Sequence, residues 1–333
     1  MIELMLEYCL FLAKTATIVV AILFVASGVI SMLFKSKLMK KDQIQVVSLN
    51  EKFKSFAQTI EQVTLPKHLW KKKFKKERSA LKKNLKKARH QGDDKNRLFV
   101  LDFAGDIKAS AVESLKEEVT AILTVAKPGD EILLRLESTG GMVHTYGLAA
   151  SQLMRIKKRE IPLTVAVDKV AASGGYLMAC VADQIISAPF AIIGSIGVIA
   201  QLPNFNRWLK KNDIDYEQIT AGNYKRTLTL FGENTDENRE KLKKELEETH
   251  DMFKEFVFQG RKNLDIDRIA TGEHWYGAKA LELNLVDEIL TSDDYLLTKS
   301  NSLDIFTVRY ETRKSLPGRL SSGIVDSLNK WRT

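Results

Sequence analysis

A run of twenty residues near the N-terminus constrains this chain more than any other feature. Thr15–Phe34 contains no charged residue, and twenty residues at a helical rise of about 1.5 Å each span roughly the 30 Å hydrocarbon core of a bilayer. A cleaved signal peptide is the alternative, because residues 25–27 (Val-Ala-Ser) offer small side chains for cleavage. The run is too long for such a peptide, and Glu3 and Glu7 precede it. We therefore predict a retained transmembrane anchor within residues 1–35.

The charge and the cysteines limit the classes of partner. The net charge of +9 favours anionic surfaces, either phospholipid headgroups or nucleic acid. Cys9 lies in the apolar N-terminal run and Cys180 in an apparent core segment, without CxxC spacing or a histidine cluster. We therefore predict no disulfide framework, no metal site and no cofactor.

Much of the positive charge lies in residues 36–97, which we interpret as a basic linker or N-terminal extension. Its dense part includes Lys71-Lys72-Lys73, with Trp70 and Phe74 at partly helical spacing. A basic helix lying against anionic lipid and a solvated linker helix both fit this pattern. Nucleic acid fits less well, because no nucleic-acid-binding motif accompanies the charge.

From Leu98 onward, short apolar runs alternate with amphipathic ones. The predicted strands are 98–103, 131–136 and 162–167, and the predicted helices are 110–126, 145–156 and an apolar helix through Cys180. This alternation predicts an α/β fold with a mainly parallel sheet, in which ligands gather at the carboxyl ends of the strands. We assign residues 98–292 to this catalytic domain.

A second uncharged run, Ile185–Leu202, competes for the role of a membrane span. Pro189, Gly194 and Gly197 interrupt it and β-branched residues dominate it, which favours two short buried strands joined by a turn. Beyond it we expect a short helix over 204–211, a strand over 216–220 and a long amphipathic helix over 236–258. Residues 293–333 carry few signals and are assigned to a C-terminal tail.

Ser173 is the candidate nucleophile. It stands in an Ala-Ala-Ser-Gly-Gly-Tyr context between a predicted strand and an apolar helix, which exposes a side chain at a helix N-terminus. A serine before a helix is, however, more often an N-cap than a nucleophile. A catalytic role therefore requires a base and an oxyanion site.

Lysine is the better candidate for the base. None of the five histidines lies in a recognisable triad context, whereas burial of a lysine amine lowers its pKa enough to accept a serine proton. Lys225 follows the predicted strand 216–220 beside small residues and a tyrosine that can wall it off from water. Lys169 competes, but it adjoins Asp168 near a strand end, where a charged, solvated state is expected. The alternative interpretation is that Lys225 is an ordinary surface lysine with no catalytic role.

Backbone donors for an oxyanion are expected at Gly140-Gly141, which follows the strand 131–136, and at Gly174. Ser195 places a hydroxyl inside an apolar stretch, where it needs a partner. A hydrogen bond that orients Lys225 satisfies that need.

In this order the motifs resemble the signal peptide peptidase A family of serine-lysine peptidases, including members with a similar N-terminal anchor and basic extension. The resemblance rests on Ser138-Thr139-Gly140-Gly141, Ala172-Ser173-Gly174-Gly175-Tyr176, Gly194-Ser195-Ile196-Gly197-Val198 and Tyr224-Lys225, and on later motifs that include Thr271-Gly272-Glu273 and Leu285-Val286-Asp287-Glu288. Two positions depart from it: Thr139 replaces the usual Pro, and Asn284 replaces a usual Gly, although Asn tolerates a left-handed backbone.

The resemblance implies a Clp protease/crotonase-like fold built from ββα units. It implies that Ser173 attacks the scissile carbonyl, that Lys225 removes its proton, that Ser195 holds the lysine, and that Gly141 and Gly174 form the oxyanion hole. The expected activity is that of a membrane-anchored serine endopeptidase that forms an acyl-enzyme and cleaves signal-peptide remnants or membrane and exported proteins. A crotonase-type enzyme and a catalytically inactive membrane scaffold are the alternatives.

The expected partners are peptide or protein substrates, membrane lipid and further copies of the chain, and nucleic acid is not expected. The expected location is the bacterial inner (plasma) membrane, crossed once. The lysines after the anchor favour a cytoplasmic catalytic domain, although the rule is weak for long domains. The family resemblance favours the periplasmic side. The side therefore stays open.

Overall fold

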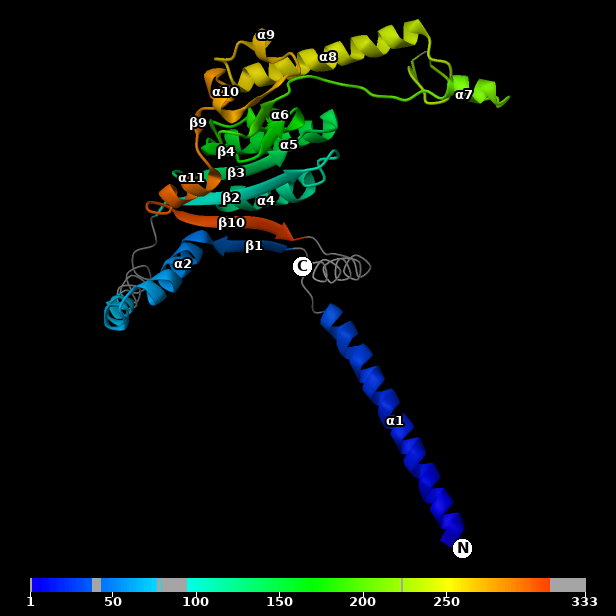
Figure 1. Ribbon diagram of the computed structural model, residues 1–333, viewed down its shortest axis with the longest axis vertical. Helices are drawn as coiled ribbons and strands as arrows, with labels where there is room; N and C mark the ends of the chain where they lie inside the picture. Colours follow the sequence, from blue (N-terminus) through cyan, green and yellow to red (C-terminus); the bar gives the residue numbers. More distant parts are fainter. Residues whose placement is uncertain (1, 38–42, 77–78, 80–94, 223, 312–333) are drawn as a thin grey trace. The chain divides into compact units, whose positions relative to one another are not determined.

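The computed structural model describes residues 2–37, 43–76, 79, 95–222 and 224–311 (Figure 1). The chain forms two compact units. One comprises residues 1–43 and 311–333, and the other residues 44–310.

The first unit contains helix α1 (Ile2–Lys37). Within α1, Tyr8–Gly28 is long and apolar enough to cross a membrane, and none of its described side chains is buried in the protein. It is the one helix of this kind in the described part of the chain. This agrees with the predicted anchor, whose uncharged run overlaps it.

The second unit is built on a mainly parallel sheet with the strand order β1-β10-β2-β3-β4-β6-β9. The path consists of β1 (Gln43–Ser48), β10 (Asp304–Glu311), β2 (Arg97–Gly105), β3 (Glu131–Ser138), β4 (Leu163–Val167), β6 (Gln184–Ser187) and β9 (Glu288–Ile289). A second layer of short strands, β5 (Val170–Ala172), β7 (Ile192–Gly194) and β8 (His274–Tyr276), branches from β3. Only the β7–β8 pairing is antiparallel among the paired strands with a described register.

Helices cover both faces of the sheet (Figure 1). The larger core cluster includes residues of α4 (Val112–Val125), α5 (Val143–Lys157), α6 (Gly174–Ala179) and α10 (Gly277–Glu282). The smaller cluster joins α11 (Ser292–Lys299) to the opposite face through Tyr295 and Leu296. A sheet buried on both faces explains the near-continuous apolar runs of β2, β3 and β4.

The predicted α/β class and the predicted strands and helices of residues 98–180 are confirmed, with boundaries shifted by at most two residues. The first part of the uncharged run Ile185–Leu202 forms core rather than a membrane span, because it builds β6 and β7, which pair with β4 and β5, whereas Ile199 and Leu202 at its end are exposed. β4, β5 and α6 follow one another as a ββα unit, the arrangement expected from the family resemblance.

An arm of the second unit runs from Val198 to α8 (Asp236–Gly260) and contains the short helix α7 (Asn206–Lys211) (Figure 1). The predicted helices over 204–211 and 236–258 are confirmed. The strand expected over 216–220 is wrong. Tyr216 and Ile219 are 44% and 94% exposed, and no strand in the described part of the chain pairs with this segment, so its backbone lacks the partner that a strand requires.

Four elements lie in segments whose sequence pattern predicted no regular structure with any strength. β1 and α2 (Leu49–Thr64) lie in the basic extension, and α11 and β10 lie in the C-terminal part of the chain from Ser292 onward. The Asn50 side chain joins the two regions, because its amide donates to the carbonyls of Ser300 and Leu303 and its oxygen accepts from the Ile305 N–H at 2.7 Å. β10 in turn pairs with β2 in parallel. The remaining short helix, α9 (Ile266–Ile269), follows α8.

Candidate active site

Ser173 occupies the N-cap position of α6 but does not cap it. Its side chain makes no capping hydrogen bond, and its backbone adopts φ +52° and ψ −119°. The turn is held because the Ser173 N–H donates to the carbonyl of Gly194 at 2.8 Å and the Ser173 carbonyl accepts from Leu177 at 3.0 Å. A positive φ at a non-glycine residue costs of order 1–3 kcal/mol and persists only where the surroundings enforce it.

The loop after β3 passes directly beside this turn. Gly140 has φ +89°, and a Cβ there would lie 2.7 Å from both the Cβ of Ser173 and the N of Gly174. A Cβ at Gly141 would lie 2.1 Å from the carbonyl oxygen of Ile107. Both positions therefore require glycine, because any larger residue would push the loop away from Ser173.

Two buried hydroxyls hold the loop from beneath. The Ser138 Oγ lies 2.5 Å from the Tyr146 Oη and accepts from the Gly140 N–H at 3.0 Å. The Tyr146 hydroxyl donates in turn to the carbonyl of Asp106 at 2.8 Å. Burial, the largest influence, raises the pKa of Tyr146, so it stays a neutral donor.

The remaining donors at this turn are free. Within the described part of the chain, neither the Gly141 N–H nor the Gly174 N–H donates a hydrogen bond. Gly174 begins a helix, whose first N–H groups have no partner within the helix. Two free N–H groups beside a serine are the donors that an oxyanion hole requires.

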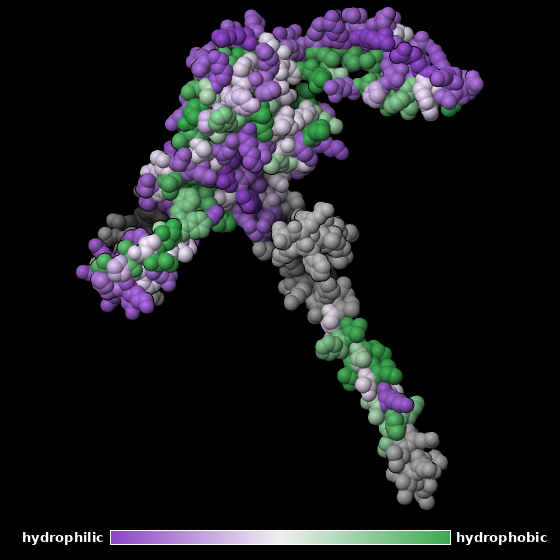
Figure 2. Space-filling view, viewed as in Figure 1, coloured by the Kyte–Doolittle hydropathy of each residue, from purple (hydrophilic) through white to green (hydrophobic). Residues whose placement is uncertain are grey.

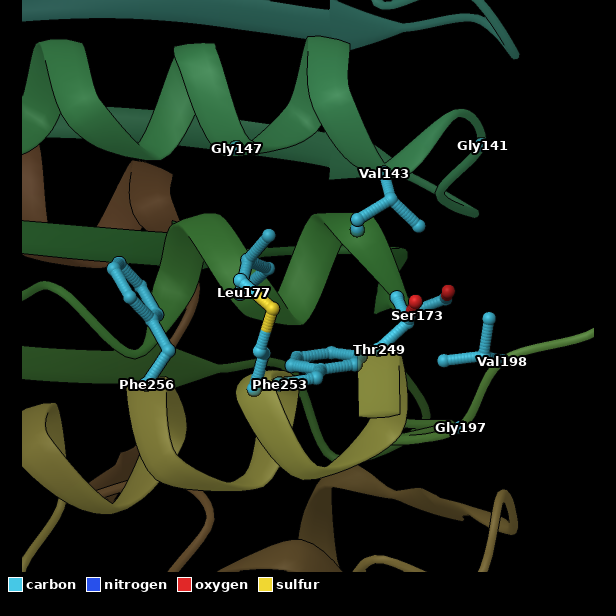
Figure 3. A pocket seen from close by; sticks show the side chains of 12 residues that line it. Gly141, Val143, Gly147, Ser173, Leu177, Gly197, Val198, Thr249, Phe253 and Phe256 are labelled. Carbon is cyan, nitrogen blue, oxygen red and sulfur yellow. The ribbon is translucent and has the colours of Figure 1, made fainter. Parts of the chain in front are cut away.

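Ser173 faces an apolar groove between α6 and α8 (Figure 3). The groove has a volume of about 180 Å³ and is lined by Gly141, Val143, Gly147, Ser173, Gly174, Leu177, Gly197, Val198, Thr249, Met252, Phe253 and Phe256. In Figure 3, Leu177 and Phe253 point into the groove beyond Ser173, with Phe256 farther along it. A chain segment that presents a carbonyl to Ser173 can therefore place an apolar side chain here.

The predicted lysine and its orienting serine are placed differently. Ser195 follows the Gly194 that binds the Ser173 N–H, and it has φ +51° with its own N–H donating to Glu273 at 2.6 Å. Lys225 is exposed and does not line the groove. One copy of the chain thus brings Ser173, Gly141, Gly174 and the Ser195 backbone together, and does not place Lys225 in the groove.

The other candidate bases have different partners. Lys169 is exposed and pairs with Glu137 at 2.9 Å, as expected for a charged, solvated lysine. The Nε2 of His250 lies 3.2 Å from the carbonyl oxygen of Ile196, while His144 and His274 are exposed.

Sequence reasoning missed the groove wall contributed by α8. Met252, Phe253 and Phe256 were assigned only to a long amphipathic helix. Their spacing indicates a buried face but not that part of it borders a groove. The supporting role of Tyr146 was missed for the same reason, since nothing local distinguishes it from a core tyrosine.

Comparison with known proteins assigns the chain to a family. A model described as "Peptidase family S49 N-terminal" matches residues 3–153, and one described as "Peptidase family S49" matches residues 155–305. The chain belongs to peptidase family S49. The S49 assignment confirms that the chain is a protease and supports the Clp protease-like fold expected above.

Curated S49 relatives cover most of the chain. "Probable protease SohB" of Haemophilus influenzae is 50% identical over 322 residues, which is 94% of this chain and 91% of the relative. "Probable protease SohB" of Buchnera aphidicola subsp. Schlechtendalia chinensis is 50% identical over 305 residues, 89% of this chain and 100% of the relative. A solved structure of the 1510-N membrane-bound stomatin-specific protease with a substrate peptide is 15% identical, covers 70% of this chain and 100% of that one, and has a TM-score of 0.42.

One departure from the family pattern is explained by the backbone. Asn284, where glycine is usual, has φ +59°. Asparagine is one of the few residues that tolerate this left-handed conformation. The substitution therefore keeps the turn before Leu285.

Proposed function

We propose that this S49 protease is a membrane-anchored serine endopeptidase that uses Ser173 as nucleophile and Lys225 as general base. The observation that carries the proposal is the state of Ser173. Its hydroxyl makes no capping hydrogen bond and faces a substrate-sized groove. Its backbone is strained and lies beside two free N–H groups. In a serine that serves only as an N-cap, the hydroxyl accepts a hydrogen bond from a backbone N–H of the first helical turn.

The chemistry follows from these positions. The neutral amine of Lys225 takes the proton of the Ser173 hydroxyl as the oxygen attacks the scissile carbonyl, and the Gly141 and Gly174 N–H groups donate to the developing oxyanion. Collapse of this intermediate expels the amine, which receives the proton from Lys225, and leaves an acyl-enzyme. Water, deprotonated by the same lysine, then releases the acyl group and restores Ser173. Ser195 orients the lysine amine in this scheme.

Lys225 reaches Ser173 of a second copy in our proposal. Within its own arm, Phe231 packs against Phe205 and Tyr216 with ring centroids 6.1 Å and 5.7 Å apart, and the Phe205 N–H donates to Leu230. The arm is thus locally ordered, yet it exposes Trp208 and Ile219 by 60% and 94%. Apolar side chains this exposed favour association with another chain, which makes a homo-oligomer the natural setting for the dyad.

The groove favours substrates with an apolar residue on the acyl side of the cleaved bond. Its walls are valine, leucine, methionine and phenylalanine side chains, with Thr249 as the polar exception besides Ser173. Signal-peptide remnants and hydrophobic segments of membrane or exported proteins carry such residues. We propose these as substrates, and α1 as the single span that holds the enzyme in the bacterial inner membrane.

Mixed oligomers test both the dyad and its assembly. Ser173→Ala and Lys225→Ala variants of verified folding, solubilised in detergent, are each expected to lose hydrolysis of a signal-peptide-like or casein substrate by at least a thousandfold. Co-expression of the two variants should restore activity, because the serine of one copy meets the lysine of the other. Activity that survives in either single variant refutes the dyad. Two inactive variants that do not complement refute only the assignment of Lys225 to a neighbouring copy.

A further inference from the structure

Helix α2 presents an apolar stripe that the described part of the chain leaves exposed. Phe56, Ile60 and Val63 are 55%, 63% and 84% exposed and recur at the spacing of one helix face. The start of α2 packs on the body of the protein, where Leu49 and Phe53 contact the smaller core cluster and Ser48 caps the helix. Apolar surface along this element is visible in Figure 2.

The helical segment 67–76, which follows α2, adds a strong positive charge to this region. It contains six lysines and no acidic residue. Trp70 and Phe74, one turn apart, stack with ring centroids 5.3 Å apart. At 100° per residue, Lys67 and Lys71 lie on one side of this aromatic pair and Lys73 on the other. Lys73 also pairs with Glu61 of α2, which ties the segment to the helix before it.

We infer that α2 and the segment 67–76 together form a lipid-docking surface that binds anionic phospholipid headgroups. An amphipathic helix of this kind lies in the interface with its aromatic and aliphatic side chains among the upper acyl chains and its lysines at the phosphates. Aromatic side chains flanked by lysines suit that boundary, where one end of a side chain is dry and the other wet.

The tether to the membrane favours lipid over other occupants. Only five residues separate α1 from β1, and β1 leads directly into α2. If α1 anchors the chain, docking becomes an intramolecular event at high effective lipid concentration. A second copy would carry the same lysines and repel this face. The inference rests on the proposed anchoring by α1 and is independent of the serine-lysine chemistry.

Fluorescence quenching in reconstituted vesicles tests the lipid-docking surface. The full-length protein is reconstituted into vesicles of phosphatidylcholine with or without about 30% phosphatidylglycerol, each containing brominated phosphatidylcholine. The signal of Trp70 is the difference between the wild type and Trp70→Phe. Trp208→Phe is the matched control, because Trp208 is 60% exposed on α7, outside this surface. Flotation of the vesicles after carbonate extraction checks the anchoring itself.

The expected result is strong quenching of Trp70 in anionic vesicles that falls with added salt or in neutral vesicles. Replacing Lys67, Lys71 and Lys75 by Gln should shift the docking equilibrium about a hundredfold toward the free state, whereas Arg at the same positions should preserve it. Peptidase activity should be unchanged, since none of these lysines lines the groove. Absence of quenching, or quenching insensitive to lipid charge, overturns the inference. A Trp70 signal that instead responds to RNA or to protein density identifies nucleic acid or a second copy as the occupant.

Discussion

Ser138→Ala removes the buried hydroxyl beneath the glycine loop without touching the groove. The Ser138 Oγ is the acceptor of the Gly140 N–H, and both residues are buried. Tyr146 keeps its bond to Asp106 in the variant, so the main loss falls on Gly140. A buried N–H without an acceptor costs about 1–3 kcal/mol.

We expect that cost to appear in catalysis, because the loop can recover it only by moving away from Ser173 and bringing water to the Gly140 N–H. Such movement misplaces the Gly141 N–H, whose oxyanion bond matters more in the transition state than in the ground state. At about 1.4 kcal/mol per factor of ten, kcat should fall roughly 5- to 150-fold with KM nearly unchanged. Outright loss of one oxyanion donor, about 10²–10³ in kcat, is the upper bound.

Steady-state hydrolysis of a peptide substrate, combined with chemical unfolding, measures both quantities. Ser300→Ala is the matched control, since its hydroxyl also bonds to the backbone, donating to the Leu297 carbonyl at 2.7 Å, but is only half-buried and lies outside the groove. It should change neither value measurably. A Ser138→Ala variant that loses 1–3 kcal/mol of unfolding free energy but keeps kcat within twofold of wild type would refute the reasoning, because the hydroxyl would then be purely structural.

Three further predictions concern the groove and two buried carboxyls. Phe256 lines both the catalytic groove and a second cavity beside Cys180; Phe256→Ala should join them and raise kcat/KM for a tryptophan relative to a leucine before the cleaved bond, by about tenfold in a peptide series. Burial raises the pKa of Asp130, but the hydrogen bonds from Arg97 and from backbone N–H groups outweigh burial, so the pKa is lowered overall. Its contribution is therefore present above about pH 4 and lost as the pH falls, so Asp130→Asn should cost about 2 kcal/mol in unfolding at pH 7 and less near pH 3. Burial, the largest influence, raises the pKa of Glu118, whose carboxylate accepts the Tyr310 N–H at 2.8 Å. Its contribution is lost as the pH rises, so Glu118→Gln should be at least as stable as wild type at pH 7, and a loss above about 1 kcal/mol would contradict this.

Much of the sheet was predictable because each central strand is buried on both faces. A strand such as Leu163–Val167 is then an uninterrupted apolar run between turns, which local sequence reveals. The part of the sheet next to its β1 edge was harder to predict. β10 pairs with β2 across some two hundred residues of sequence, and its register depends on Asn50 and on the β2 backbone rather than on a local pattern. Residues 216–220 show the converse: their sequence pattern suits a strand, but none of the described strands pairs with them.

The site was predictable where it depends on backbone geometry. Glycines at 140, 141 and 174 were chosen as backbone N–H donors at turns beside Ser173, and the structure gives close contacts that exclude a Cβ at each. The position of Lys225 could not be derived in this way. Nothing in a linear sequence shows whether a residue acts in its own chain or reaches a neighbour. The expected dry wall around this lysine was argued from its sequence neighbours alone, whereas the described structure leaves Lys225 exposed.

The motif around Gly194 has a backbone role that does not depend on Lys225. In the β5–β7 register Ala172 lies opposite Gly194, whose carbonyl accepts the N–H of Ser173. Gly194 has φ +105°, and a Cβ there would lie 2.9 Å from the Trp275 ring of β8. β8 and Glu273 thus fix β7, and β7 fixes the strained turn of the nucleophile. Substitution at Gly194 should therefore disable Ser173 even where a lysine is correctly placed, whereas Ser195→Ala, which keeps this backbone, isolates what the Ser195 hydroxyl itself contributes.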